Sequence, residues 1–104
     1  MSLEPYYNAV ANGATVTFRP RGSSMTGIIN NKDEVVVVPC EVSDIKKDVV
    51  VLCKVKGRIY LHKVLSVQLA SSRCLIGNNK GGQNGWTSFA KVVGRVKTVN
   101  GHDI

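Results

Sequence analysis

Hydrophobic and polar residues alternate with a period of two along much of the chain, the pattern of strands that bury one face. A short alternating run covers residues 14–18, and a run of β-branched residues covers 34–38. The strongest strand signals are residues 48–56 and 58–67, which flank Gly57. Because glycine accepts the backbone conformation that a tight turn needs, we predict a β-hairpin centred on Gly57.

The remaining segments are shorter or less regular. Residues 72–76 form another short strand signal, and residues 89–99 form a closing strand. The segment 77–88 between them is rich in glycine and asparagine and is predicted to be a loop. Helical periodicity never exceeds one or two turns, and residues 1–12 are predicted to be an irregular, flexible arm. The pattern predicts an all-β domain over residues 13–104, with curled antiparallel sheets that form a partly open barrel.

Composition supports one folded domain outside the membrane. The chain has 104 residues, of which 43% are hydrophobic, too many for a disordered chain. No apolar stretch approaches the ~20 residues that cross a bilayer, and the N-terminal residues lack the pattern of a signal peptide. The cysteines Cys40, Cys53 and Cys74 have no metal-ligand spacing, and unpaired thiols are typical of a reducing compartment. We therefore expect a soluble, cytoplasmic protein with no membrane anchor, metal or cofactor.

The formal net charge is +7, which makes nucleic acid a candidate partner. The lysines and arginines are scattered along the chain, however, and aromatic residues are only 6% of it, few for base stacking. Solubilising surface charge explains the same composition, so we do not expect nucleic acid to be the partner.

Several kinds of site lack support in the sequence. The glycine-rich segment at residues 77–85 has neither the lysine motif nor the long following helix of a phosphate-binding P-loop. The only histidines are His62 and His102, and no His/Cys cluster has metal-ligand spacing. No pair of carboxylates stands out, so glycosidase chemistry is not indicated.

One serine has a different setting. Ser24 lies in the segment Gly22-Ser23-Ser24-Met25, at the break between two predicted strands. A serine on such a loop can be exposed beside backbone N–H groups, the arrangement of a nucleophile with an oxyanion hole. The alternative is ordinary turn chemistry, which also favours Ser and Gly.

The order of the segments after Ser24 carries a resemblance to a known family. Ser24-Met25 precedes the valine run, the predicted hairpin, Gly77-Asn78-Asn79 and finally Val93-Gly94-Arg95-Val96. In this order the segments resemble the sequence boxes of signal peptidases and of LexA-type self-cleaving repressors, over residues 16–99. The resemblance implies a fold like the catalytic core of these serine proteases.

The sequence box that matches the predicted hairpin indicates which residue would act as the base. Bacterial signal peptidases carry a catalytic lysine there, but the matching triplet here is His62-Lys63-Val64. In this respect the chain is similar to the endoplasmic-reticulum and archaeal signal peptidases, and the resemblance implies Ser24 as nucleophile and His62 as general base. Strand alternation puts His62 and Lys63 on opposite faces, so only one of them can face Ser24. Imidazole, with a free pKa of ~6.5, acts near neutrality without the desolvation that lysine needs, although a lone histidine can also be structural.

The chain departs from the family in three respects: the acidic positions, the residue two before Ser24 and the position of Gly27. Asn78 matches the aspartate expected after the hairpin, and a further acidic position falls near Asn84. An asparagine can orient an imidazole but cannot stabilise its charged form, and forming turns is the alternative role for these asparagines. Gly22 offers no hydroxyl to an oxyanion, and Gly27 stands where proline is usual.

The resemblance implies a serine endopeptidase with catalytic residues Ser24, His62 and Asn78. Its substrate would be a protein or peptide bound in extended conformation beside Gly22, Ser23 and Met25. The alternative is a peptidase-like domain that has lost catalysis and binds protein. We expect neither the membrane anchor of a signal peptidase nor the DNA-binding domain of a LexA-type repressor, but a free-standing relative of the kind that a phage or mobile element encodes.

Overall fold

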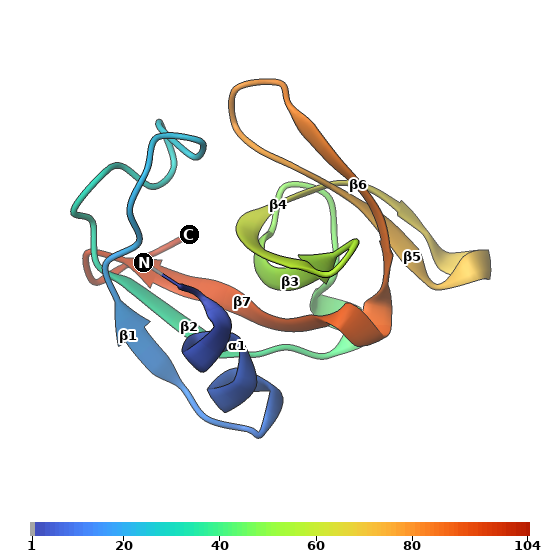
Figure 1. Ribbon diagram of the computed structural model, residues 1–104, viewed down its shortest axis with the longest axis horizontal. Helices are drawn as coiled ribbons and strands as arrows, with labels where there is room; N and C mark the ends of the chain where they lie inside the picture. The colour runs from blue at the N-terminus through green and yellow to red at the C-terminus, as the bar shows by residue number, and fades with distance from the viewer. Residues whose placement is uncertain (1) are drawn as a thin grey trace.

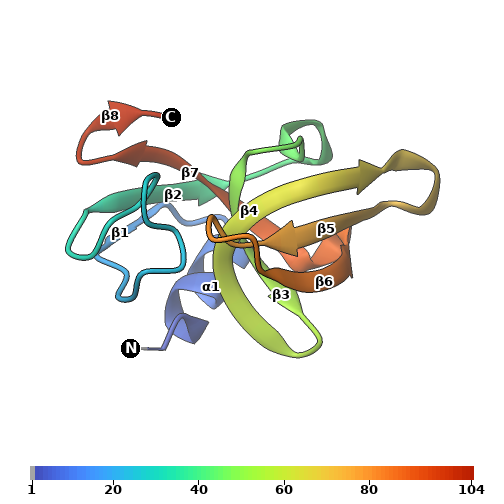
Figure 2. The same ribbon diagram turned by 90° about the horizontal axis from the view of Figure 1, so that it is seen from above.

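A computed structural model describes residues 2–104 and shows a curled antiparallel β-sheet with one α-helix against it (Figure 1). The strands are β1 (Val16–Phe18), β2 (Val35–Pro39), β3 (Val50–Val55), β4 (Arg58–Gln68), β5 (Arg73–Gly77), β6 (Gln83–Ser88), β7 (Val92–Val99) and β8 (His102–Asp103). They lie in the order β1-β2-β7-β3-β4-β5-β6, and β8 pairs with β7. The sheet curls without closing (Figure 2). The predicted all-β fold of curled antiparallel strands is therefore confirmed.

Strands β3 and β4 form the predicted hairpin. Their register pairs Val55 with Arg58 across the two-residue turn Lys56-Gly57. Both turn residues have positive φ, 51° and 81°, as a type I′ turn requires. Beyond the turn, the register between β4 and β5 shifts at Val64, and such irregularities bend a strand and increase its twist. The bend turns β4 toward the segment that contains Ser24.

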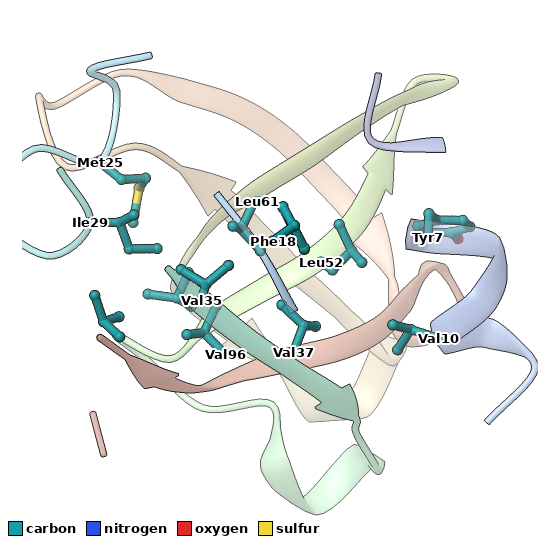
Figure 3. Packing of buried hydrophobic residues seen from close by; sticks show 12 residues of the cluster. Tyr7, Val10, Phe18, Met25, Ile29, Val35, Val37, Leu52, Leu61 and Val96 are labelled. Carbon is teal, nitrogen blue, oxygen red and sulfur yellow. The ribbon is translucent and has the colours of Figure 1, made fainter. Parts of the chain in front are cut away.

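The N-terminal segment is not an irregular arm where the structure describes it; the first residue lies outside that part. Glu4–Ala11 form α1, with Pro5 in the first turn, where its missing N–H has no partner to lose. Tyr7 and Val10 of α1 are buried against the sheet (Figure 3). A helix of eight residues depends on such tertiary contacts, and it is too short for sequence periodicity to reveal. Within residues 2–104 no helix combines the length and apolarity needed to cross a bilayer.

The predicted loop over residues 77–88 is also shorter than expected. Its second half forms β6, an edge strand that pairs with β5. Only Thr87 of β6 is buried, so the strand lacks the alternation that marks a half-buried strand. The closing strand begins late as well, because residues 89–91 form a 3₁₀ turn before β7. The missed strand β6 and the late start of β7 have the same cause, because a polar edge strand and a short turn show little hydrophobic periodicity in the sequence.

Two hydrophobic clusters share the central strand β3. Val50 and Leu52 belong to one cluster, whereas Val51 and Cys53 belong to the other, because successive side chains of a strand point to opposite faces. The first, here called the helix-side cluster, is drawn in Figure 3 and comprises Tyr7, Val10, Phe18, Met25, Ile29, Val35, Val37, Val50, Leu52, Leu61, Val96 and Val99. The second, here called the hairpin-side cluster, comprises Ile45, Val51, Cys53, Val55, Val64, Cys74, Ile76, Phe89 and Val92.

Candidate active site

Ser24 lies in the connection between β1 and β2, here called the serine segment (residues 20–31). Met25 and Ile29 are buried in the helix-side cluster and anchor this segment to the core (Figure 3). The N–H groups of Ile28 and Ile29 both donate to the Met25 carbonyl, at 3.0 and 2.8 Å. A tight turn immediately after Ser24 is thus held by the core, and Ser24 itself stays partly exposed at its rim.

The structure brings Ser24 and His62 together. Ser24 Oγ lies 3.0 Å from His62 Nε2, within the reach expected of a nucleophile and its base. On the other side of the ring, His62 Nδ1 lies 2.7 Å from Asn84 Oδ1. The amide oxygen can only accept, so Nδ1 carries the proton and donates it. Nε2 is then free to accept the hydroxyl proton of Ser24.

Asn84, and not Asn78, is the residue that orients His62. Asn78 Oδ1 accepts hydrogen bonds from the N–H groups of Lys80 and Gly82, at 2.8 and 2.9 Å. Its own N–H donates to the Gly82 carbonyl at 3.0 Å. These bonds close the turn that joins β5 to β6, which leaves the Asn78 side chain committed to the backbone. The prediction that Asn78 supports His62 is therefore wrong, and Asn84, near which the further acidic position of the family falls, contacts the ring instead.

Strand alternation separates His62 from Lys63 as predicted. His62 points to Ser24, whereas the Lys63 ammonium donates to Asn79 Oδ1 at 2.9 Å. Both residues belong to β4, where neighbouring side chains leave on opposite faces. The lysine therefore has its own partner, away from the serine hydroxyl.

The surroundings of His62 keep its ring neutral. The side chain is buried, with 9% of its surface exposed, and this burial lowers its pKa below the ordinary 6.5. The hydrogen bond to Asn84 opposes this effect, since it favours the protonated ring, but it is the weaker cause. Tyr60 stacks on the imidazole, with ring centroids 5.0 Å apart and planes 29° apart. At neutral pH the site thus holds a neutral, oriented imidazole beside a hydroxyl.

Backbone N–H groups are available beside the serine. Within residues 2–104, the N–H groups of Ser24 and Met25 donate to no acceptor. Gly22 has a φ of 110°, in the left-handed region that glycine tolerates, and carries no side chain that could donate. The N–H groups of Ser24 and Met25 are therefore donors that could stabilise an oxyanion at Ser24, whereas Gly22 offers no side-chain donor.

A cavity of about 150 Å³ opens beside Ser24 and His62. Two of the three predicted substrate contacts, Gly22 and Met25, line it, but Ser23 does not. The Ser23 hydroxyl instead accepts a hydrogen bond from the Lys80 ammonium at 3.2 Å. One further lining residue is Leu3, in the N-terminal segment that the sequence predicts to be a flexible arm. The other lining residues are mainly apolar and comprise Pro20, Arg21, Ile29, Asn30, Ile59, Tyr60 and Leu61.

The cysteines lie outside this site. All three are free thiols, and Cys53 and Cys74 are buried in the hairpin-side cluster. Burial raises the pKa of Cys40 and of Cys74 to about 11, so both stay protonated and unreactive near neutrality. In the part of the chain that the structure describes, no three His, Cys, Asp or Glu residues gather as a metal site.

Comparisons of this chain with protein-family models, with curated proteins and with solved structures find no match. The chemistry at Ser24 is therefore inferred from the geometry of the site and from the order of its sequence segments.

Proposed function

We propose that this protein is a serine endopeptidase of the signal-peptidase type, with Ser24 as nucleophile and His62 as general base. One observation carries the proposal: the hydrogen bonds that join Ser24 Oγ to His62 Nε2 and His62 Nδ1 to Asn84 Oδ1. A nucleophile, a base within hydrogen-bonding distance and a third group that orients the base together form the arrangement for nucleophilic catalysis. The three side chains come from the serine segment, β4 and β6, so folding is what assembles them.

The reaction follows from the positions of the protons. Ser24 Oγ attacks the peptide carbonyl carbon while its proton passes to His62 Nε2. The imidazolium then gives that proton to the leaving amine as the C–N bond breaks, which leaves an ester on Ser24. Water attacks the ester, its proton passes through Nε2 to Ser24 Oγ, and the free acid leaves. The N–H groups of Ser24 and Met25 would donate to the oxyanion that forms in both steps.

An extended peptide is the substrate that this site suits best. Strand β1 ends the sheet order, and the serine segment continues directly from it, so backbone groups of a bound peptide could add to this edge. The adjoining cavity, whose surface is both polar and apolar, offers a pocket for one side chain. Peptidases of this kind read the backbone by strand addition and the side chains by such pockets.

A second candidate function is binding without cleavage, and one observation favours it. The partner of His62 Nδ1 is an amide and not a carboxylate, so no negative charge compensates the imidazolium that the reaction would form. In that case the same edge and cavity would hold a peptide without cutting it.

Labelling with a fluorophosphonate probe separates the two candidates, because an activated serine oxygen attacks the phosphorus and displaces fluoride to leave a phosphonate ester on the serine. We expect wild-type protein to be labelled, and both Ser24→Ala and His62→Ala to lose most of the labelling and of any peptide cleavage. The losses should not add in the double variant, because the two residues act as a unit. Lys63→Ala should lower the rate far less than His62→Ala, and His102→Ala, at the other histidine, serves as the matched control. Labelling that survives Ser24→Ala, or activity that survives His62→Ala but not Lys63→Ala, would refute the proposal.

A further inference from the structure

Asn79 connects the serine segment to the strand that carries His62. Its backbone N–H donates to the Ser24 carbonyl at 2.8 Å. Its side-chain amide N–H donates to the Thr26 carbonyl at 2.7 Å, and its amide oxygen accepts from the Lys63 ammonium at 2.9 Å. Asn79 thus forms hydrogen bonds to the backbone on both sides of Met25, and a third hydrogen bond joins it to Lys63, the residue next to His62.

We propose that Asn79 is a positioning residue that sets the separation of Ser24 and His62, and this proposal rests on the proposed function of that pair. Ser24 and His62 belong to two different segments of the chain. The helix-side cluster holds the serine segment through Met25 and Ile29, and β4 is held by its neighbours in the sheet and by Leu61 in the same cluster. Asn79 joins these two segments, because it forms hydrogen bonds both to the backbone of the serine segment and to Lys63 of β4.

The role of Lys63 follows from its hydrogen bond. Because the ammonium can only donate, it fixes the oxygen of the Asn79 amide toward β4 and the amide N–H groups toward Thr26. Lys63 thus orients Asn79, although it does not reach Ser24.

Gly27 shows how closely the two segments approach. A Cβ atom at this position would lie 3.0 Å from Asn79 Nδ2, and the φ of Gly27 is +101°. Proline, which the family usually has near this position, would need a φ near −65°. The glycine therefore permits both the turn and the contact with Asn79.

The alternative for Asn79 is a purely local role in the β5–β6 turn. That role already belongs to Asn78, which accepts from Lys80 and Gly82. The side chain of Asn79 makes its bonds outside the turn, to Thr26 and Lys63. Asn78→Ala is therefore the matched control, because it loosens the same turn without removing a bond to the serine segment.

The test measures the coupling between Ser24 and His62 without relying on catalysis. NMR titration of the His62 ring is recorded for wild type, Ser24→Ala, Asn79→Ala and the double variant, with His102 as internal reference. Removal of the hydroxyl that donates to Nε2 should raise the titration midpoint of His62 in the wild-type background. If Asn79 positions the hydroxyl, Ser24→Ala should shift the midpoint clearly less in the Asn79→Ala background. An equal shift in both backgrounds would overturn the proposal.

A second measurement uses the rate of probe labelling at Ser24. We expect Asn79→Ala to slow labelling by about 10- to 100-fold, since a displacement of ~1 Å at a reacting pair has effects of this size. Asn79→Asp, which keeps the contact with Lys63 but cannot donate to Thr26, should fall between wild type and Asn79→Ala. Asn78→Ala should change the rate much less, and thermal unfolding of each variant sets a temperature at which all are folded. Equal losses in Asn78→Ala and Asn79→Ala would also contradict the proposal.

The two proposals can fail separately. If the wild-type protein is never labelled, the peptidase proposal fails, but the NMR coupling still measures whether Asn79 sets the position of Ser24. If labelling is present and the coupling does not depend on Asn79, only the positioning proposal fails.

Discussion

Asn84 holds His62 by geometry alone. Its amide oxygen accepts from Nδ1 at 2.7 Å and thereby selects the ring form in which Nε2 can take a proton. A carboxylate at this position would also stabilise the imidazolium by charge. Because burial lowers the pKa of His62, the wild-type ring is neutral over a wider pH range than a free imidazole, but it is also a weaker base.

We therefore predict that Asn84→Asp raises the rate of cleavage or probe labelling by about tenfold. A hydrogen bond to a charged group contributes ~1–1.5 kcal/mol more than a neutral one, and ~1.4 kcal/mol corresponds to tenfold. The added charge should also raise the pKa of His62. The activity of the wild type should rise with pH with a midpoint below 6.5, and the midpoint of Asn84→Asp should lie at higher pH.

The rate–pH profiles of wild type, Asn84→Asp and Asn78→Asp check this prediction. Asn78 serves as the control because its oxygen accepts from backbone N–H groups of the turn and not from the ring. An increase in Asn78→Asp but not in Asn84→Asp would show that the wrong asparagine has been assigned.

The sequence was sufficient to predict that the side chains of Ser24 and His62 meet, but not which asparagine contacts the His62 ring. Segment order and strand alternation both selected His62 over Lys63, and alternation depends only on the chain being extended. Asn78 and Asn84 lie in the same glycine-rich stretch, and which one reaches the ring depends on how that stretch folds. Asn78 bonds to the backbone of its own turn, whereas the pairing of β6 with β5 places Asn84 beside the ring. Both arrangements depend on hydrogen bonds of the backbone, which the pattern of hydrophobic and polar side chains does not predict.

Among the elements, those with strong hydrophobic alternation were predictable and those held by tertiary contacts were not. The β3–β4 hairpin was predicted because both strands and the Gly57 turn have clear local signals. Helix α1 has only two buried residues, Tyr7 and Val10, and its stability depends on the sheet surface that it covers. That surface is made mainly by β7 and β2, which are distant in sequence, and to a smaller extent by β1.

The packing of α1 on the sheet depends on Gly94 of β7. A Cβ atom there would lie 2.7 Å from Val10 Cγ1, 2.9 Å from Val37 Cγ1 and 2.9 Å from the Val38 carbonyl oxygen. We predict that Gly94→Ala destabilises the protein by ~1–3 kcal/mol, the usual cost of overpacking, although alanine suits a strand better than glycine. Urea unfolding measures the change, and Lys97→Ala, at an exposed position of the same strand, is the control. An increase in stability would mean that α1 does not pack on β7 as described.

At the scale of the whole molecule, the two hydrophobic clusters are joined through one strand. Leu52 faces the helix-side cluster and Val51 the hairpin-side cluster, and both are fully buried. The contact between Ser24 and His62 depends on this connection, because Met25 of the helix-side cluster anchors the serine segment, whereas His62 lies on the hairpin. If the two clusters unfolded independently, the separation of Ser24 and His62 would change whenever either one loosened.

We predict that the domain unfolds in a single cooperative transition. Trp86, the only tryptophan, lies in β6, which packs beside the hairpin-side cluster through β5. Leu52→Ala removes side-chain contacts from the helix-side cluster and should cost ~2–5 kcal/mol, as truncations of fully buried leucines do. Because β3 belongs to both clusters, this variant should lower the urea midpoint measured by Trp86 fluorescence as much as the midpoint measured by far-ultraviolet circular dichroism. A Trp86 transition that stays at its wild-type midpoint while the circular dichroism shifts would show two independent units, and the site would then lie between parts that move separately.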